Sequence, residues 1–184
     1  MNIKKPPALV AAIFFCLVAA RADAAALQIS SPAFSSGHAI PQQYTCSGVD
    51  ISPELAWKNV PQGTKSLALT VRDPDAPAGI WTHWVMYNIP ASLQGLPAHV
   101  PPRARLANGG EQGLNSFGKM GYGGPCPPYG NAPHRYYFRL YALDTHLQPM
   151  PDATVTEIET AMKGHILSSA VLMGRYGRGK TRTK

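Results

Sequence analysis

The sequence predicts a single domain dominated by β-strands, with helices only at its periphery. The chain has 184 residues, of which 17 are glycine and 18 are proline, and only 15% are charged. A chain of this length forms one hydrophobic core. Its many turn-forming residues favour short strands over long helices.

The N-terminal segment, residues 1–24, is typical of a secretory signal peptide. Two lysines precede an apolar run over residues 8–20, and Ala22 and Ala24 occupy the two positions that a signal peptidase reads. We expect cleavage after Ala24, export to the periplasm or beyond, and a single mature domain over residues 25–184. The apolar run is too short to span a bilayer, so a membrane-spanning protein is not expected.

Alternation of apolar and polar residues, interrupted by turn-formers, predicts the strands. Residues 66–72 alternate in this way and end at DPDAPAG, where two prolines and a glycine stop a strand. The segments expected to be extended are residues 27–34, 55–57, 66–72, 83–89 and 134–142.

The C-terminal part of the chain changes to a helical period. Thr154 and Glu157 have the spacing of a capping box, which predicts a helix that ends near Gly164. We predict a second short helix over residues 166–173. His165, between the two, is expected to cap or pack against a helix.

Three apolar rows each include an ionisable side chain at one end, because alternate residues of a strand share a face. The rows are Leu67, Leu69, Val71 and Asp73; His83, Val85, Tyr87 and Ile89; and His134, Tyr136, Phe138, Leu140 and Ala142. A carboxylate on an apolar face is costly unless it is paired. Asp73, His83 and His134 therefore either meet in one polar pocket or each bond local backbone.

Two cysteines remain after residue 24, Cys46 and Cys126. An even pair in an exported protein favours a disulfide, because the compartment is oxidising. The alternative is that Cys126 acts as a nucleophile near His134, but the sequence offers no recognisable activating arrangement.

The C-terminus is strongly basic in a chain whose formal net charge is +7. We expect a solvated tail over about residues 177–184, with weak contact to anionic lipid as the alternative. Nucleic-acid binding is not expected, since no basic stripe interleaved with aromatic residues is visible. The basic residues concerned are Arg175, Arg178, Lys180, Arg182 and Lys184.

Several separated motifs resemble the phosphatidylethanolamine-binding protein (PEBP) family, in its bacterial, Raf kinase inhibitor-like branch of YbhB/YbcL type. The resemblance extends over nearly the whole mature chain. The motifs are YTCSGVDISPELAW (44–57), DPDAP (73–77), His83-Trp84, GPCPP (124–128), HRYYFRLYALD (134–144) and GHILSSAVLMGRYGR (164–178).

The resemblance implies an antiparallel β-sheet sandwich with short C-terminal helices and one small anion-binding cavity. Cys126 stands where eukaryotic members have glycine, and it is expected in the pocket wall, while Tyr176 is a weaker candidate to help close the pocket. The residues that the resemblance assigns to the cavity are Asp73, His83, Pro127, Pro128, His134 and Tyr136.

The predicted function is non-catalytic binding of a small phosphorylated or anionic ligand, such as a phosphoethanolamine-like headgroup. Two imidazoles, a phenol and loop N–H groups supply donors on several sides of a phosphate. Asp73 would orient a histidine or bind an ammonium group of the ligand. No cofactor or metal is expected.

Two other classes of function stay open at this point. The protein could act through a protein partner, as an inhibitor of a protease or kinase or as a signal to a host. It could also be a hydrolase that uses Asp73 and the two histidines, with zinc and Cys126 as a fourth ligand. Against the hydrolase, the sequence contains no GxSxG or HExxH motif.

Overall fold

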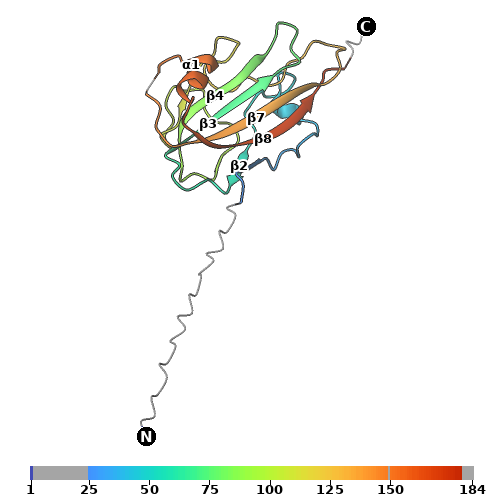
Figure 1. Ribbon diagram of the computed structural model, residues 1–184. Coiled ribbons are helices and arrows are strands. Elements are labelled where there is room, and N and C mark those ends of the chain that lie inside the picture. Colours follow the sequence, from blue (N-terminus) through green and yellow to red (C-terminus); the bar gives the residue numbers. More distant parts are fainter. Residues whose placement is uncertain (2–24, 149, 180–184) are drawn as a thin grey trace, which may run out of the picture.

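The computed structural model describes Met1 and residues 25–148 and 150–179. The expected signal peptide and its cleavage site lie outside the described residues, as do Lys180, Arg182 and Lys184 of the basic tail. The described chain folds into two antiparallel sheets with one short α-helix at the periphery (Figure 1). The predicted fold class, β-dominated with peripheral α-structure, is confirmed.

The larger sheet has five strands in the order β6-β4-β3-β7-β8, and the smaller has three in the order β1-β2-β5. The strands are β1 (Gln28–Ser30), β2 (Leu55–Lys58), β3 (Ser66–Asp73), β4 (Trp81–Pro90), β5 (Gly95–Leu96), β6 (Glu111–Gln112), β7 (His134–Leu143) and β8 (Ile166–Tyr176). A 3-10 turn, η1 (Gln42–Tyr44), and the helix α1 (Val155–Ala161) complete the elements.

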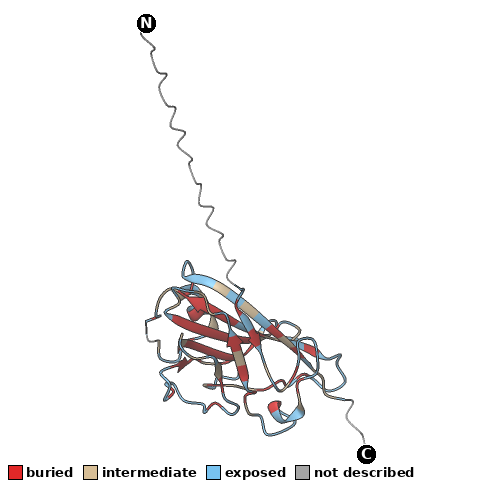
Figure 2. Ribbon diagram, turned by 90° about the horizontal axis from the view of Figure 1, so that it is seen from below, coloured by how far each residue is buried: buried red, intermediate tan, exposed pale blue. Residues whose placement is uncertain are grey.

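The larger sheet is the middle layer, with an apolar cluster on each face. The cluster facing the small sheet contains the inward row of β3 and the row of β7 that includes Phe138, whose ring packs 5.6 Å from that of Phe34. The cluster on the opposite face joins Val85 and Tyr87 to Ile158 and Met162 at α1. Figure 2 shows the inner strands mostly buried and the edge strand largely exposed.

The expected rows on β3 and β7 are present, but the row on β4 is wrong. Val85 and Tyr87 face α1, whereas Ile89 lies in the cluster that faces the small sheet. β4 has two β-bulges against β3, and each extra residue reverses the alternation. At the second bulge, Trp84 and Thr82 pair with consecutive residues of β3, which leaves His83 as the extra residue.

Helix α1 begins with the predicted capping box. The Thr154 hydroxyl accepts a hydrogen bond from the Glu157 amide at 3.4 Å, and the Glu157 carboxylate accepts one from the Thr154 amide at 2.8 Å. These two bonds satisfy backbone donors that the first turn of a helix leaves free.

The second predicted helix is wrong, because residues 166–173 belong to β8. This strand pairs with β7 along its length, from Leu143 opposite Ile166 to His134 opposite Tyr176. The antiparallel ladder satisfies the backbone of the segment and overrides its weak local helical pattern. His165 neither caps nor packs against a second helix, since its Nδ1 hydrogen-bonds the exposed Asp144 carboxylate at 2.8 Å.

Cys46 and Cys126 form the expected disulfide, at a sequence separation of 80 residues. The bond joins the loop after η1 to the loop before β7. A cross-link that closes so long a loop removes many conformations from the unfolded chain. With its sulfur in this bond, Cys126 is available neither as a thiolate nucleophile nor as a zinc ligand.

We predict that replacing both Cys46 and Cys126 by alanine lowers the free energy of unfolding by about 2–4 kcal/mol. Urea denaturation of the oxidised protein and of the double variant measures the difference. Adding reductant should shift the wild-type midpoint toward that of the variant and leave the variant unchanged. Equal midpoints, or labelling of Cys46 or Cys126 in the denatured, non-reduced protein, would show that the bond is absent.

Candidate functional site

A cavity of about 240 Å³ opens where β3, β4 and β7 meet the loops at one end of the larger sheet. We call it the Asp/His cavity. Its lining residues are Asp73, Ala76, Pro77, Ala78, Trp81, His83, Phe117, Cys126, Pro127, Pro128 and His134. The structure thus brings Asp73, His83 and His134 to one place.

A buried pair between Asp73 and His134 forms the floor of the cavity. The Asp73 Oδ2 atom lies 2.8 Å from the His134 Nδ1 atom, and both side chains are nearly inaccessible to solvent. The other oxygen of Asp73 accepts the Asp75 amide at 2.8 Å. An ionised carboxylate only accepts hydrogen bonds, so Nδ1 of His134 carries a proton and Nε2 is left for the cavity.

His83 has the same tautomer for a different reason. Its Nδ1 atom lies 2.6 Å from the Gly123 carbonyl oxygen, which is an acceptor, so Nδ1 donates and Nε2 carries the lone pair of the neutral ring. Burial lowers the pKa of His83 below its usual 6.5, and the Gly123 carbonyl and the Asp73 charge offset this only in part. At neutral pH the His83 ring is therefore uncharged.

Tyr136 supplies a buried hydroxyl without a partner. The residue is 0% exposed, and its ring packs edge-on against His83 with centroids 5.1 Å apart. Burial and the nearby Asp73 charge raise the pKa of Tyr136, so the phenol keeps its proton. Among the described residues nothing accepts from this hydroxyl, and an unmet buried donor is costly. Tyr136 lies behind His83 rather than in the cavity lining.

The loop that contains Pro127 and Pro128, which we call the proline loop, forms one wall of the cavity. The chain that follows β8 supports this loop. Arg178 donates from Nε to the Pro127 carbonyl at 2.6 Å, and its guanidinium lies 4.0 Å from the centre of the Tyr129 ring. Arg178 is therefore part of the packed structure, which corrects the prediction that the solvated tail begins near residue 177. Tyr176 does not line the cavity, and pairs across the sheet with His134.

The proline loop lies close against the loop after η1 because residue 124 is a glycine. Its amide donates to the Asp50 carboxylate at 2.7 Å. A Cβ atom at this position would come within 2.6 Å of the Tyr44 carbonyl oxygen, so no larger residue fits. This close approach and the disulfide fix the same wall.

Two aromatic residues of the cavity were missed by the sequence analysis. The Phe117 ring packs edge-on against both Trp81 and His83, with centroids 5.4 Å apart in each case. Trp81 also holds a buried indole N–H that has no partner among the described residues. The signal for Phe117, which is 41% exposed, was an aromatic residue inside a loop of turn-formers, where no strand or helix explains its presence.

Within residues 25–148 and 150–179, no group of three or more histidine, cysteine, aspartate or glutamate side chains is arranged so that it could hold a metal ion. In the same part of the chain, no helix has the length and apolar character that crossing a membrane requires.

The sequence of this chain matches the family described as phosphatidylethanolamine-binding protein over residues 30–177. The chain belongs to this family. A UPF0098 protein of Methanothermobacter thermautotrophicus is 50% identical over 153 residues, which cover 83% of this chain and 100% of that protein. A UPF0098 protein of Aquifex aeolicus is 45% identical over 158 residues, covering 85% and 92%.

Solved structures of family members have the same architecture. A phosphatidylethanolamine-binding protein homologue from Chlamydia trachomatis is 43% identical with a TM-score of 0.76, covering 83% of this chain and 98% of that one. YbcL of Escherichia coli, described as a member of the mammalian PEBP family, is 36% identical with a TM-score of 0.78, covering 83% and 99%.

We predict that His83 makes the protein less stable as the pH falls below 6.5. The unfolded chain binds a proton at His83 near pH 6.5, whereas the folded chain binds it only at a lower pH. The unfolded state is therefore favoured as the pH drops through this interval. Urea midpoints of wild type and His83→Asn between pH 8 and pH 5 measure the effect. Asparagine keeps a donor for the Gly123 carbonyl but does not titrate.

The variant should lose less stability than wild type over this range, while His38→Asn, at an exposed histidine, should behave like wild type. A pH dependence that is the same in His83→Asn and wild type would contradict the assignment of the shift to His83.

Proposed function

We propose that the protein binds a small phosphorylated or other anionic ligand with a phosphoethanolamine-like headgroup in the Asp/His cavity, without catalysis. The observation that carries this proposal is the use of the two imidazoles. In both His83 and His134, Nδ1 donates a hydrogen bond to a protein acceptor. Each ring therefore has only Nε2 left for the cavity that both rings line. Protonation at Nε2 turns both into donors for a phosphate oxygen.

The polar groups around the cavity support a ligand that carries both charges. The Tyr136 hydroxyl and the Trp81 indole N–H are donors without a partner in the described chain. Asp73 would repel an isolated phosphate, but it accepts a hydrogen bond from His134 and can attract a ligand ammonium group. A zwitterionic headgroup therefore fits the pocket better than a bare dianion does.

The size of the cavity supports a headgroup rather than a whole lipid. Pockets for drug-sized ligands enclose roughly 300–1,000 Å³, and this cavity encloses about 240 Å³. Trp81 and Phe117 give it an apolar rim beside the polar floor. Acyl chains, where a ligand has them, would have to extend outside.

The chemistry of the lining residues supports binding without turnover. The cavity has a histidine oriented by a carboxylate, as a general base would be. No serine, threonine or lysine stands among the lining residues, and Cys126 is held in the disulfide. Among these lining residues, a covalent intermediate therefore has no hydroxyl, thiol or amine nucleophile.

Export is part of the proposal. The N-terminal sequence has the charged, apolar and small-residue regions of a signal peptide. The disulfide is of a kind that persists in oxidising compartments. The protein would therefore meet its ligand in the periplasm or outside the cell.

We predict that the protein binds phosphoethanolamine saturably at pH 6 and that His134→Asn weakens this binding by about tenfold or more, the loss expected for a charge-assisted hydrogen bond. Asparagine keeps a donor for Asp73 and removes the Nε2 position. Isothermal titration calorimetry on protein purified from cells that express the full chain measures the affinity, with His38→Asn as the matched control. Absence of binding to the wild type, or equal affinity in His134→Asn, would refute the proposal, and release of phosphate would refute its non-catalytic part.

We also predict that Tyr136→Phe weakens ligand binding without lowering the free energy of unfolding. Removing a buried hydroxyl that has no partner leaves the free energy of unfolding unchanged or slightly higher. The same change should weaken phosphoethanolamine binding, because Tyr136, although outside the cavity lining, lies beside Asp73 and its hydroxyl acts on the ligand through that carboxylate. Urea denaturation and calorimetry on the same preparation test both halves, with Tyr129→Phe at an exposed tyrosine as control. A loss of stability without a loss of affinity would show that the hydroxyl is structural.

A further inference from the structure

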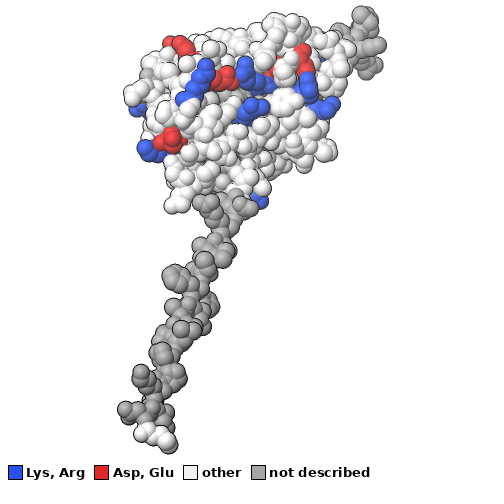
Figure 3. All heavy atoms as spheres, viewed as in Figure 1, with Lys and Arg blue, Asp and Glu red and all other residues white. Residues whose placement is uncertain are grey.

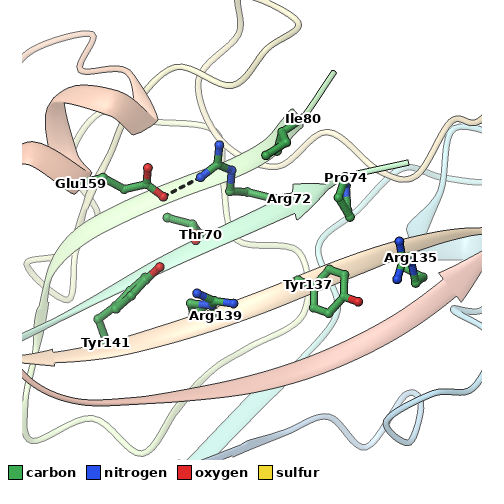
Figure 4. Close-up of a pocket in the computed structure, with 9 residues that line it drawn as sticks. All are labelled: Thr70, Arg72, Pro74, Ile80, Arg135, Tyr137, Arg139, Tyr141 and Glu159. Atoms are coloured by element: carbon green, nitrogen blue, oxygen red, sulfur yellow. Dashed lines mark hydrogen bonds and ion pairs between the residues drawn. The ribbon is translucent and has the colours of Figure 1, made fainter. Parts of the chain in front are cut away.

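A second and larger hollow lies on the opposite face of the larger sheet, beside α1. It encloses about 550 Å³, and we call it the outer groove. Figure 4 shows its side chains, which rise from β3 and β7 on the same face, with Glu159 of α1 closing one side. Its lining residues are Thr70, Arg72, Pro74, Ile80, Arg135, Tyr137, Arg139, Tyr141 and Glu159.

The outward residues of β7 alternate arginine with tyrosine. Arg135, Tyr137, Arg139 and Tyr141 share one face of the strand, because the inward row holds the residues between them. This is a basic stripe interleaved with aromatic residues, a pattern that the sequence analysis took to be absent. Figure 3 shows that basic and acidic side chains gather together across this face.

The charges in the outer groove are mixed. Arg72 pairs with Glu159 at 2.7 Å, and Arg135 holds Asp75 through two hydrogen bonds at 2.6 and 2.9 Å. These bonds lower the pKa of Asp75 to about 2, so the carboxylate stays ionised. Within the described residues Arg139 is exposed and makes no ion pair or side-chain hydrogen bond, and the Arg72 Nε atom is buried without an acceptor.

We propose that the outer groove binds an acidic, extended segment of a partner protein, with Arg139 as its main charged anchor. The groove follows β7 from Arg135 to Tyr141, which is about 20 Å at the rise of a strand. That length exceeds a small anion and matches an extended peptide of about seven residues. Arginine and tyrosine are among the residue types enriched at the energetically important positions of protein interfaces.

The mixed charge favours a polypeptide over a nucleic acid or a membrane. Asp75 and Glu159 stand at the edges of the groove, where they would repel the continuous negative charge of a phosphate backbone. A peptide can place a carboxylate on Arg139 and neutral residues beside the two acids. A hollow surface also fits an extended segment better than the plane of a bilayer.

Apolar contacts are available at the margins of the groove. Ile80 is 58% exposed at one end. Val171 of β8 is 43% exposed and pairs across the sheet with Arg139. A segment with apolar residues flanking its carboxylates would therefore bury both kinds of side chain.

The test uses an acetylated, amidated heptapeptide that alternates glutamate with threonine, and its counterpart with glutamine in place of glutamate. Protein purified from cells that express the full chain is titrated while amide chemical shifts are followed by NMR. We expect the glutamate peptide to shift the amides of Thr70, Tyr137 and Arg139. Arg139→Glu should weaken binding by about tenfold, as loss of a charge-assisted contact predicts, and the glutamine peptide should lose binding to the same extent.

The matched control is Arg103→Glu, which reverses an equally exposed charge outside the groove and should leave the affinity within about twofold, as is usual for a charge outside the contact. Equal melting temperatures for both variants show that folding is intact. The proposal is overturned if Arg139→Glu binds as tightly as wild type, or if the shifts fall on the Asp/His cavity. It is also overturned if an oligothymidylate or phosphatidylglycerol vesicles bind through Arg139 while the glutamate peptide does not.

Discussion

The hydrogen bond between the buried Asp73 carboxylate and the His134 imidazole is the interaction on which the Asp/His cavity depends. It lets a carboxylate end the apolar row of β3 without an unpaired buried charge, which would be strongly destabilising. It also fixes the tautomer of His134, so one nitrogen is committed to the protein and the other to the cavity. The same bond ties the ends of two strands that pair along their length.

The bulge at His83 is the second condition for this arrangement. A regular β4 would place His83 on the same face as Val85 and Tyr87, but the bulge lets His83 join Asp73 at the cavity while Val85 and Tyr87 pack against α1. The carbonyl of Gly123 then fixes the His83 ring from the loop side. The disulfide and Arg178 stabilise the neighbouring loop, so the cavity is held by contacts that approach it from three parts of the chain.

Local pattern, an even cysteine pair and the motif resemblance were enough for much of the fold and the site, and what the sequence analysis missed depends mostly on distant pairing. Alternation was enough for the rows of β3 and β7, and the capping box was enough for α1. The strand character of residues 166–173 comes from their ladder with β7, which no local pattern displays. The bulge at His83, the packing of Phe117 on that ring and the contact of Arg178 with Pro127 depend in the same way on segments far apart in the chain.

The two faces of β7 line two separate hollows of the protein. The inward row ends in His134 at the Asp/His cavity, and the outward row of arginine and tyrosine lines the outer groove. Asp75 connects them: its amide donates to Asp73, while its carboxylate holds Arg135. Asp75 therefore connects the Asp73 carboxylate to the Arg135 guanidinium through a single residue.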